Sequence, residues 1–200
     1  MRAAIGYLIL VPLVLGHAVG CEAPTTPRIR ETVLTPDDTV PPPDTEPLPP
    51  LGPYADAVMY VVRHAEKSTE PPADPSLTVE GAARAEDLAD VLADVPLVAA
   101  HSTDTARTIE TATPTAEGHG LDVEIYTLPT TLIEDIRTRG GDHLVVGHST
   151  TIGSIVTLAG GDPGPPVAYS EFDRLYIVVV PAEGEPATVR LHYGEPTVVE

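Results

Sequence analysis

Short apolar runs alternate with amphipathic segments over residues 57–192 of this 200-residue chain, and this alternation constrains the fold most strongly. The apolar runs lie at 57–62, 97–100, 123–126, 143–146, 174–180 and 188–192. Runs this short, bounded by Gly, Pro or polar residues, are typical of buried strands. Helix-start residues and apolar faces mark the segments 78–93, 103–117, 132–137 and 150–158. We therefore predict a three-layer α/β/α domain with a mostly parallel sheet.

The charge balance limits the class of ligand. The chain has 30 Asp or Glu against 11 Lys or Arg, which gives a formal net charge of −19. Nucleic-acid binding needs a basic surface, so we expect no nucleic-acid partner. One cysteine cannot form an internal disulfide, and no Cys/His pair has the spacing of a zinc site. We therefore predict neither a metal nor a cofactor.

The first twenty residues have the pattern of an export signal. Arg2 supplies a positive charge, and residues 3–19 are almost wholly apolar but short for a membrane span. Small residues precede Cys21, which resembles the lipobox of bacterial lipoproteins, where such a cysteine is lipidated. We predict a signal peptide over residues 1–20 and a lipid anchor on Cys21, with secretion and a free cysteine as the alternative.

A proline-rich segment follows the cysteine. Ten prolines fall between residues 22 and 53, with almost no apolar periodicity. Such composition favours an extended, semi-rigid spacer. We predict that residues 21–53 tether a folded domain, residues 54–200, to a membrane of the cell envelope, on its periplasmic or extracellular side. The sequence does not indicate an oligomeric state.

Four short motifs fall at predicted strand ends or helix starts. They are Arg63-His64-Ala65, Leu77-Thr78-x-x-Gly81, Thr103 with Arg107 and Thr111-Ala112, and Gly147-His148. Ligands of parallel sheets bind beyond the carboxyl ends of the strands. We therefore expect the residues of these motifs to converge on one site.

This set of motifs resembles the histidine phosphatase superfamily, also called the phosphoglycerate mutase-like family. The family pattern is Arg-His-Gly, then Leu-Thr-x-x-Gly, then Ser with Arg four residues on and Thr-Ala, then Gly-His. Thr103 stands in the place of the serine, and Ala65 in that of the first glycine. Over residues 57–180, the resemblance implies a phosphoglycerate mutase-like fold and phosphoryl transfer through a phosphohistidine.

Apart from the resemblance, the residue types themselves suit phosphoryl transfer through a histidine. A neutral imidazole is a nucleophile when one ring nitrogen is held as a donor and the other faces phosphorus, and His64 is the candidate. Arg63 and Arg107 offer forks of N–H donors to phosphate oxygens, and a protonated His148 would add another donor. A small phosphorylated substrate is the expected partner. Taken singly, each of these residues could instead be an ion-pair partner or a core histidine.

The general acid is the least determined part of the site. Glu66, Glu134 and Asp135 are candidates, and a good leaving group would need none of them. The short interval 113–146 resembles compact phosphatases rather than mutases. Two alternatives to a phosphomonoesterase stay open, a phosphohistidine-protein phosphatase and a phosphate-ester-binding lipoprotein without turnover.

Two groups of polar residues outside the motifs are expected to have structural roles. We interpret His101 as a packing residue. We expect Glu171 and Asp173 to lie in a solvated loop, with an approach to the site formed by the motifs as the alternative.

Overall fold

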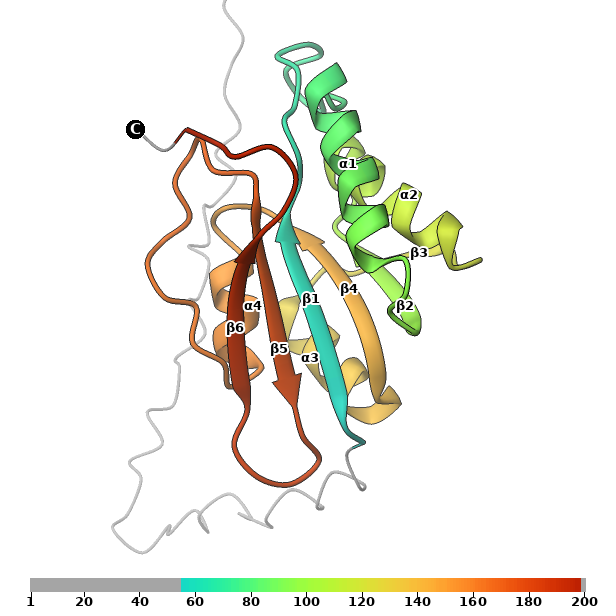
Figure 1. Cartoon of the computed structure of the whole chain (residues 1–200), viewed down its shortest axis with the longest axis vertical. Helices are drawn as coiled ribbons and strands as arrows, with labels where there is room; N and C mark the ends of the chain where they lie inside the picture. Colours follow the sequence, from blue (N-terminus) through green and yellow to red (C-terminus); the bar gives the residue numbers. More distant parts are fainter. Residues whose placement is uncertain (1–54, 199–200) are drawn as a thin grey trace, which may run out of the picture. The chain divides into compact units, whose positions relative to one another are not determined.

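The computed structural model describes residues 55–198, so the predicted signal peptide, Cys21 and the tether lie outside the described residues. Four helices and six strands form this part of the chain (Figure 1). In chain order they are β1 (Ala57–Arg63), α1 (Val79–Leu92), β2 (Leu97–Ser102), α2 (Ala106–Gly118), β3 (Val123–Ile125), α3 (Pro129–Arg139), β4 (Gly141–Gly147), α4 (Ile152–Leu158), β5 (Arg174–Val180) and β6 (Ala187–His192). In residues 55–198 no helix has the length and apolarity needed to cross a bilayer.

The six strands form one sheet in the order β3-β2-β4-β1-β5-β6. The pairings among β3, β2, β4 and β1 are parallel, whereas β5 pairs antiparallel with both β1 and β6. The sheet is therefore mostly parallel, as predicted. Because β2, β4 and β1 are neighbours, their carboxyl ends meet at one edge of the sheet, where ligands bind in such folds.

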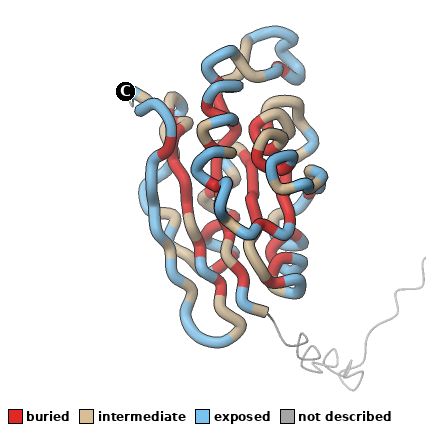
Figure 2. The backbone as a smooth tube through the Cα atoms, turned by 45° about the vertical axis from the view of Figure 1, so that its right-hand side comes forward, coloured by how far each residue is buried: buried red, intermediate tan, exposed pale blue. Residues whose placement is uncertain are grey.

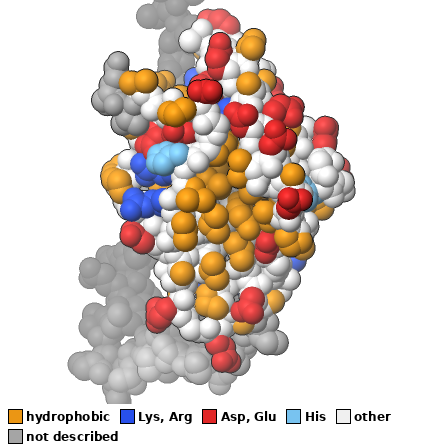
Figure 3. All heavy atoms as spheres, in the orientation of Figure 1, with side chains coloured by type: hydrophobic (Ala, Val, Ile, Leu, Met, Phe, Trp, Pro, Cys, Tyr) orange, Lys and Arg blue, Asp and Glu red, His pale blue; other side chains and the backbone are white. Residues whose placement is uncertain are grey.

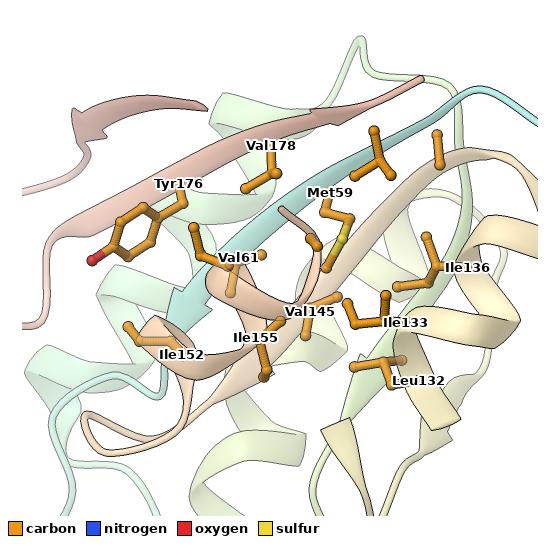
Figure 4. Close-up of a cluster of buried hydrophobic side chains, with 14 of the residues drawn as sticks. Met59, Val61, Leu132, Ile133, Ile136, Val145, Ile152, Ile155, Tyr176 and Val178 are labelled. Atoms are coloured by element: carbon orange, nitrogen blue, oxygen red, sulfur yellow. The ribbon is translucent and has the colours of Figure 1, made fainter. Parts of the chain in front are cut away.

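Alternation along the strands sorts the core into two clusters, one on each face of the sheet. Met59 and Val61 of β1 belong to the cluster that packs beneath α3 and α4, with Ile136 and Ile155 (Figure 4). The intervening Val62 belongs to the other cluster, which includes residues of α1 and α2. The predicted three-layer α/β/α architecture is confirmed.

The helices do not cover both faces equally. α2 packs on β2 and β4, and α1 packs on α2, whereas β6 is exposed along most of its length (Figure 2). Val179, Val189 and Leu191 are 43%, 52% and 44% exposed. Figure 3 shows apolar side chains gathered on the open part of the sheet.

Several predicted boundaries hold and others shift: α2 begins at Ala106 rather than near Thr103, and β4 begins two residues early, at Gly141. α1 begins after Thr78, whose side chain accepts a hydrogen bond from the N–H of Gly81, as predicted. α3 begins at Pro129, three residues before the expected start, because proline suits the first turn of a helix. β2 continues two residues beyond expectation, to Ser102, because its end pairs with both β3 and β4.

Candidate active site

β1 ends at Arg63, and His64 follows at the edge of the sheet. The backbone N–H of His64 donates to the carbonyl of Gly147 at 2.9 Å, which ties it to the end of β4. Its ring Nδ1 lies 2.8 Å from the carbonyl oxygen of Ala65. A carbonyl oxygen only accepts, so Nδ1 carries the proton and Nε2 of the neutral ring keeps its lone pair.

The surroundings of His64 favour the neutral ring. The side chain is almost fully buried, and this burial lowers the pKa of His64 to about 4. The positive charge of Arg63, the nearby His148 and the charge of Arg107 also contribute to this lowered pKa, whereas the hydrogen bond with the carbonyl of Ala65 opposes it. His64 is therefore uncharged at neutral pH, the form in which an imidazole is a nucleophile.

His148 faces His64 across the end of the sheet. The two rings meet edge to face, with their centroids 5.5 Å apart. His148 Nε2 lies 3.0 Å from Oγ1 of Thr103, the residue in the family's serine position. Burial, and then the charges of Arg107 and Arg63, lower the pKa of His148. These causes favour the neutral ring of His148, which still offers one N–H.

Arg63 is fixed by a loop that the sequence motifs do not include. Its Nη1 donates to the carbonyl oxygens of Ala168, Tyr169 and Glu171 at 3.1, 2.7 and 2.9 Å. Its guanidinium lies 4.1 Å from the centroid of the Phe172 ring, a cation–π contact. Its Nε is buried without a hydrogen-bond partner among the described residues. In the sequence, the only feature that marks this contact is Phe172, the single phenylalanine of the chain.

Arg107 occupies the first turn of α2 and is half-buried. Its Nη1 lies 3.5 Å from Oδ1 of Asp74, and its Nε is also buried and unpaired within residues 55–198. The Asp74 carboxylate accepts from the N–H of Ala106 at 2.9 and 3.1 Å, so it anchors the start of α2. Sequence reasoning missed Asp74, although it lies just before the Leu77-Thr78 motif.

The remaining motif residues support the loop that carries His64. The N–H of Ala65 donates to Thr111 Oγ1 at 3.0 Å, which joins this loop to α2. A methyl group on Gly81 would collide with the carbonyl of Glu66, so this motif position needs glycine. Ala65 does not have a positive φ, so alanine replaces the family's glycine without backbone strain.

The positions of the three candidate residues do not favour any of them as the general acid. The Glu66 carboxylate is bound by Arg84, with N···O distances of 2.8–3.0 Å. Glu134 and Asp135 are exposed on α3, and Asp135 pairs with Arg139 at 3.1 Å. Asp135 lies beside β3, among His101 and Glu124, rather than with His64.

The expectation of a solvated loop at Glu171 and Asp173 is wrong. Glu171 is 3% exposed and Asp173 5% exposed, because each has partners that compensate for its burial. Glu171 accepts from Arg174 Nη2 at 2.8 Å, and Asp173 accepts from the Thr197 hydroxyl at 2.6 Å. The loop thereby holds the carbonyl groups that bind Arg63. The prediction that His101 packs in the core is confirmed, since its ring is 2% exposed.

Several solved structures share this fold. Phosphoglycerate mutase from Bacillus anthracis matches with a TM-score of 0.55 at 17% identity, covering 70% of this chain and 94% of that chain. The protein histidine phosphatase SixA, complexed with tungstate, matches with a TM-score of 0.57 at 14% identity, covering 68% and 96%. A phosphohistidine phosphatase SixA from Agrobacterium tumefaciens, described as putative, gives 0.52 at 21% identity, covering 70% and 98%.

The sequence profile of the histidine phosphatase superfamily, branch 1, matches residues 59–128. Residues 59–128 are thus similar in sequence to this superfamily, and the domain shares its fold with the solved structures above. This matched stretch contains Arg63, His64 and Arg107, while His148 reaches the same site through the parallel pairing of β1 with β4. No curated protein sequence matches this histidine phosphatase-like chain significantly.

Proposed function

We propose that this domain is a phosphatase that hydrolyses a phosphate monoester through a phosphohistidine on His64. One observation carries the proposal: the Nε groups of Arg63 and Arg107 are buried without partners within residues 55–198, beside a neutral His64 with a free Nε2. Buried N–H groups are rarely left unpaired. A phosphate group would satisfy both arginines and present its phosphorus to the imidazole.

The reaction follows from these positions. The Nε2 lone pair of His64 attacks phosphorus while the P–O bond to the alcohol breaks, and the alcohol oxygen takes a proton. Water then attacks the phosphohistidine, the P–N bond breaks, and inorganic phosphate leaves. Arg63 and Arg107 stabilise the charge on the equatorial oxygens, the role that metal ions have in other phosphoryl-transfer enzymes. We therefore infer that the reaction needs no metal.

The proton for the alcohol is best assigned to solvent. The Glu66 carboxylate is occupied by Arg84, and Glu134 and Asp135 lie on exposed α3. Substrates with good leaving groups need little acid assistance. We therefore expect aryl phosphates to turn over faster than alkyl phosphates.

The comparisons support an oxyanion-binding site. A SixA protein with this fold was crystallised with tungstate, which is a tetrahedral oxyanion like phosphate. The names of two structural neighbours also favour a second candidate, a phosphohistidine-protein phosphatase. A comparison of kcat/KM for a phosphohistidine peptide and an aryl phosphate distinguishes the two candidates.

The test of activity is phosphate release from a chromogenic aryl phosphate in the presence of a strong chelator. Turnover supports the phosphatase. Tight phosphate binding without turnover would instead identify a non-catalytic phosphate-ester-binding protein.

We also propose that the domain is exported and anchored to a membrane through lipid on Cys21. The proposal rests on the apolar residues 3–19, the small residues before Cys21 and the proline-rich stretch that follows. Cys21→Ser should move the protein from the membrane to the soluble exported fraction. Unchanged membrane retention of this variant would contradict the lipid anchor.

A further inference from the structure

A chain of hydrogen bonds fixes the protons on two buried histidines next to β3. His143 Nε2 lies 3.0 Å from the carbonyl oxygen of Gly140, and His143 Nδ1 lies 3.0 Å from His101 Nε2. The carbonyl accepts, so His143 Nε2 carries a proton and Nδ1 of a neutral His143 is an acceptor. His101 Nε2 must then donate, which leaves the lone pair of a neutral His101 on Nδ1.

Burial keeps both rings in this neutral form. His101 is 2% exposed, and His143 is fully buried, with the two rings stacked at a centroid distance of 5.2 Å. Burial lowers the pKa of His101 to about 4, and burial also lowers the pKa of His143. A metal-binding histidine commonly donates its second ring nitrogen to a fixed acceptor, as His101 does here.

The lone pair of His101 is directed at a carboxylate. Its Nδ1 lies 3.7 Å from Oε2 of Glu124, beyond hydrogen-bond range. Two groups that both offer lone pairs repel each other unless a cation lies between them. The separation is close to the roughly 3.3–3.5 Å that neighbouring ligands have around a zinc ion with bonds of about 2.0–2.1 Å.

A second carboxylate completes the group. One ligand atom from each of His101, Glu124 and Asp135 lies within 4.8 Å of the others. These residues line a cavity of about 410 Å³ beside the loop that contains Thr127 and Leu128. Both carboxylates are about half exposed, so small side-chain rotations can close them around an ion and leave room for water as a further ligand.

Arg139 is the one cation that contacts both carboxylates in residues 55–198. It binds Glu124 at 2.7 and 3.0 Å and Asp135 at 3.1 Å. This pairing keeps the Glu124 carboxyl ionised, because the hydrogen bond from Arg139 lowers its pKa. A carboxylate has about four lone-pair sites, so the bonds to Arg139 leave others for a metal. Arg139 thus orients the carboxylates and also competes with an ion.

We propose that His101, Glu124 and Asp135 form a binding site for a divalent transition-metal ion such as Zn²⁺. One imidazole nitrogen and two carboxylate groups are a ligand set that zinc accepts. The three ligands come from β2, β3 and α3, so the ion would clamp the β3 edge of the sheet to the helix that covers it. This group of residues differs from the one proposed to bind phosphate at His64, and the proposal does not depend on the phosphatase activity.

The test is a calorimetric titration of ZnCl₂ into the chelator-treated full chain, together with a thermal unfolding series. We expect one ion per chain and a Tm that rises with Zn²⁺ concentration, because binding to the folded state stabilises it. Glu124→Gln keeps the shape of an exposed side chain. It should weaken binding by at least the roughly 10–100-fold that loss of an outer hydrogen-bond partner costs.

A spectroscopic measurement separates metal binding from a structural role of His101. Zn²⁺ should shift the ¹⁵N resonance of His101 Nδ1, while Nε2 stays protonated. His192→Ala is the matched control, because His192 belongs to the other described group of potential ligands, with Glu171 and Asp173. Binding that is lost in His192→Ala but kept in Glu124→Gln, or no saturable binding by the wild-type chain, would overturn the proposal.

Discussion

The Nδ1–H of His64 donates to the carbonyl oxygen of Ala65, the next residue in the chain, at 2.8 Å. This local contact selects Nε2 as the nitrogen that is free to attack phosphorus. The same contact explains why Ala65 can replace the glycine of the family motif, since the bond uses the backbone carbonyl and not the side chain. Orientation of the nucleophile is therefore set by the chain itself before substrate binds.

Replacing the nucleophile should abolish turnover. His64→Ala is expected to lower kcat by about 10⁴–10⁶-fold, as loss of a covalent nucleophile does in other enzymes. Rapid mixing with ³²P-labelled substrate, quenched without acid, should trap label on His64. His192→Ala removes an exposed imidazole from β6 and should leave the rate unchanged. Label on His148 or on a serine would contradict the assignment.

Phosphate binding should depend on the fork of Arg107. Lysine keeps the charge but cannot offer two parallel donors, so Arg107→Lys should lower kcat/KM by roughly 10²–10³-fold. The fold should be retained, because Arg107 contacts only the exposed Asp74 through its side chain among the described ion pairs. The same loss should appear as weaker inhibition of the Arg107→Lys variant by vanadate.

The control for this variant is Arg190→Lys on the exposed strand β6. Equal losses in the two variants would contradict a specific role for the guanidinium of Arg107 in phosphate binding.

Thr103 should act by positioning His148. Its hydroxyl lies 3.0 Å from His148 Nε2, so Thr103→Val removes the contact with little change in volume. A neutral hydrogen bond contributes about 0.5–1.5 kcal/mol, which corresponds to a decrease in kcat of up to about tenfold. Thr103→Ser keeps the hydroxyl and should retain the rate. If Thr103 served only in packing, the serine variant would not be more active than the valine variant.

Much of the fold could be predicted because apolar periodicity is local. β5 was predicted over the residues it occupies, and Thr78 was predicted as the cap of α1. The four predicted site residues come together because parallel pairing of neighbouring strands places their carboxyl ends at one edge.

Contacts between distant segments could not be predicted in this way. The loop that binds Arg63 is more than 100 residues further along the chain, and no local pattern marks its carbonyl groups as partners. His101, Glu124 and Asp135 are likewise spread over three elements, so their sequence spacing differs from that of known zinc motifs. Sequence spacing reveals ligands that share one element, and it misses ligands that only the tertiary fold brings together.

Acid should destabilise the fold through His64. Burial lowers its pKa from 6.5 in the unfolded chain to about 4 in the folded state. Between these values the unfolded state binds more protons than the folded state, so the free energy of unfolding decreases as pH falls from about 6.5 to about 4. Urea unfolding at several pH values should show this decrease, and His64→Gln should make it shallower. NMR titration of the His64 Cε1–H near pH 6.5 would contradict the prediction.

Chelation should separate the two proposed sites of this molecule. The cation role at the phosphate belongs to Arg63 and Arg107, so phosphatase turnover should persist in a strong chelator. The same treatment should remove Zn²⁺ bound at His101, Glu124 and Asp135 and lower the Tm. Both quantities can be measured on one sample before and after Zn²⁺ is restored. Loss of turnover in chelator, recovered with a divalent ion, would place the metal in the reaction itself and would contradict a mechanism in which two guanidinium groups stabilise the transferring phosphoryl group.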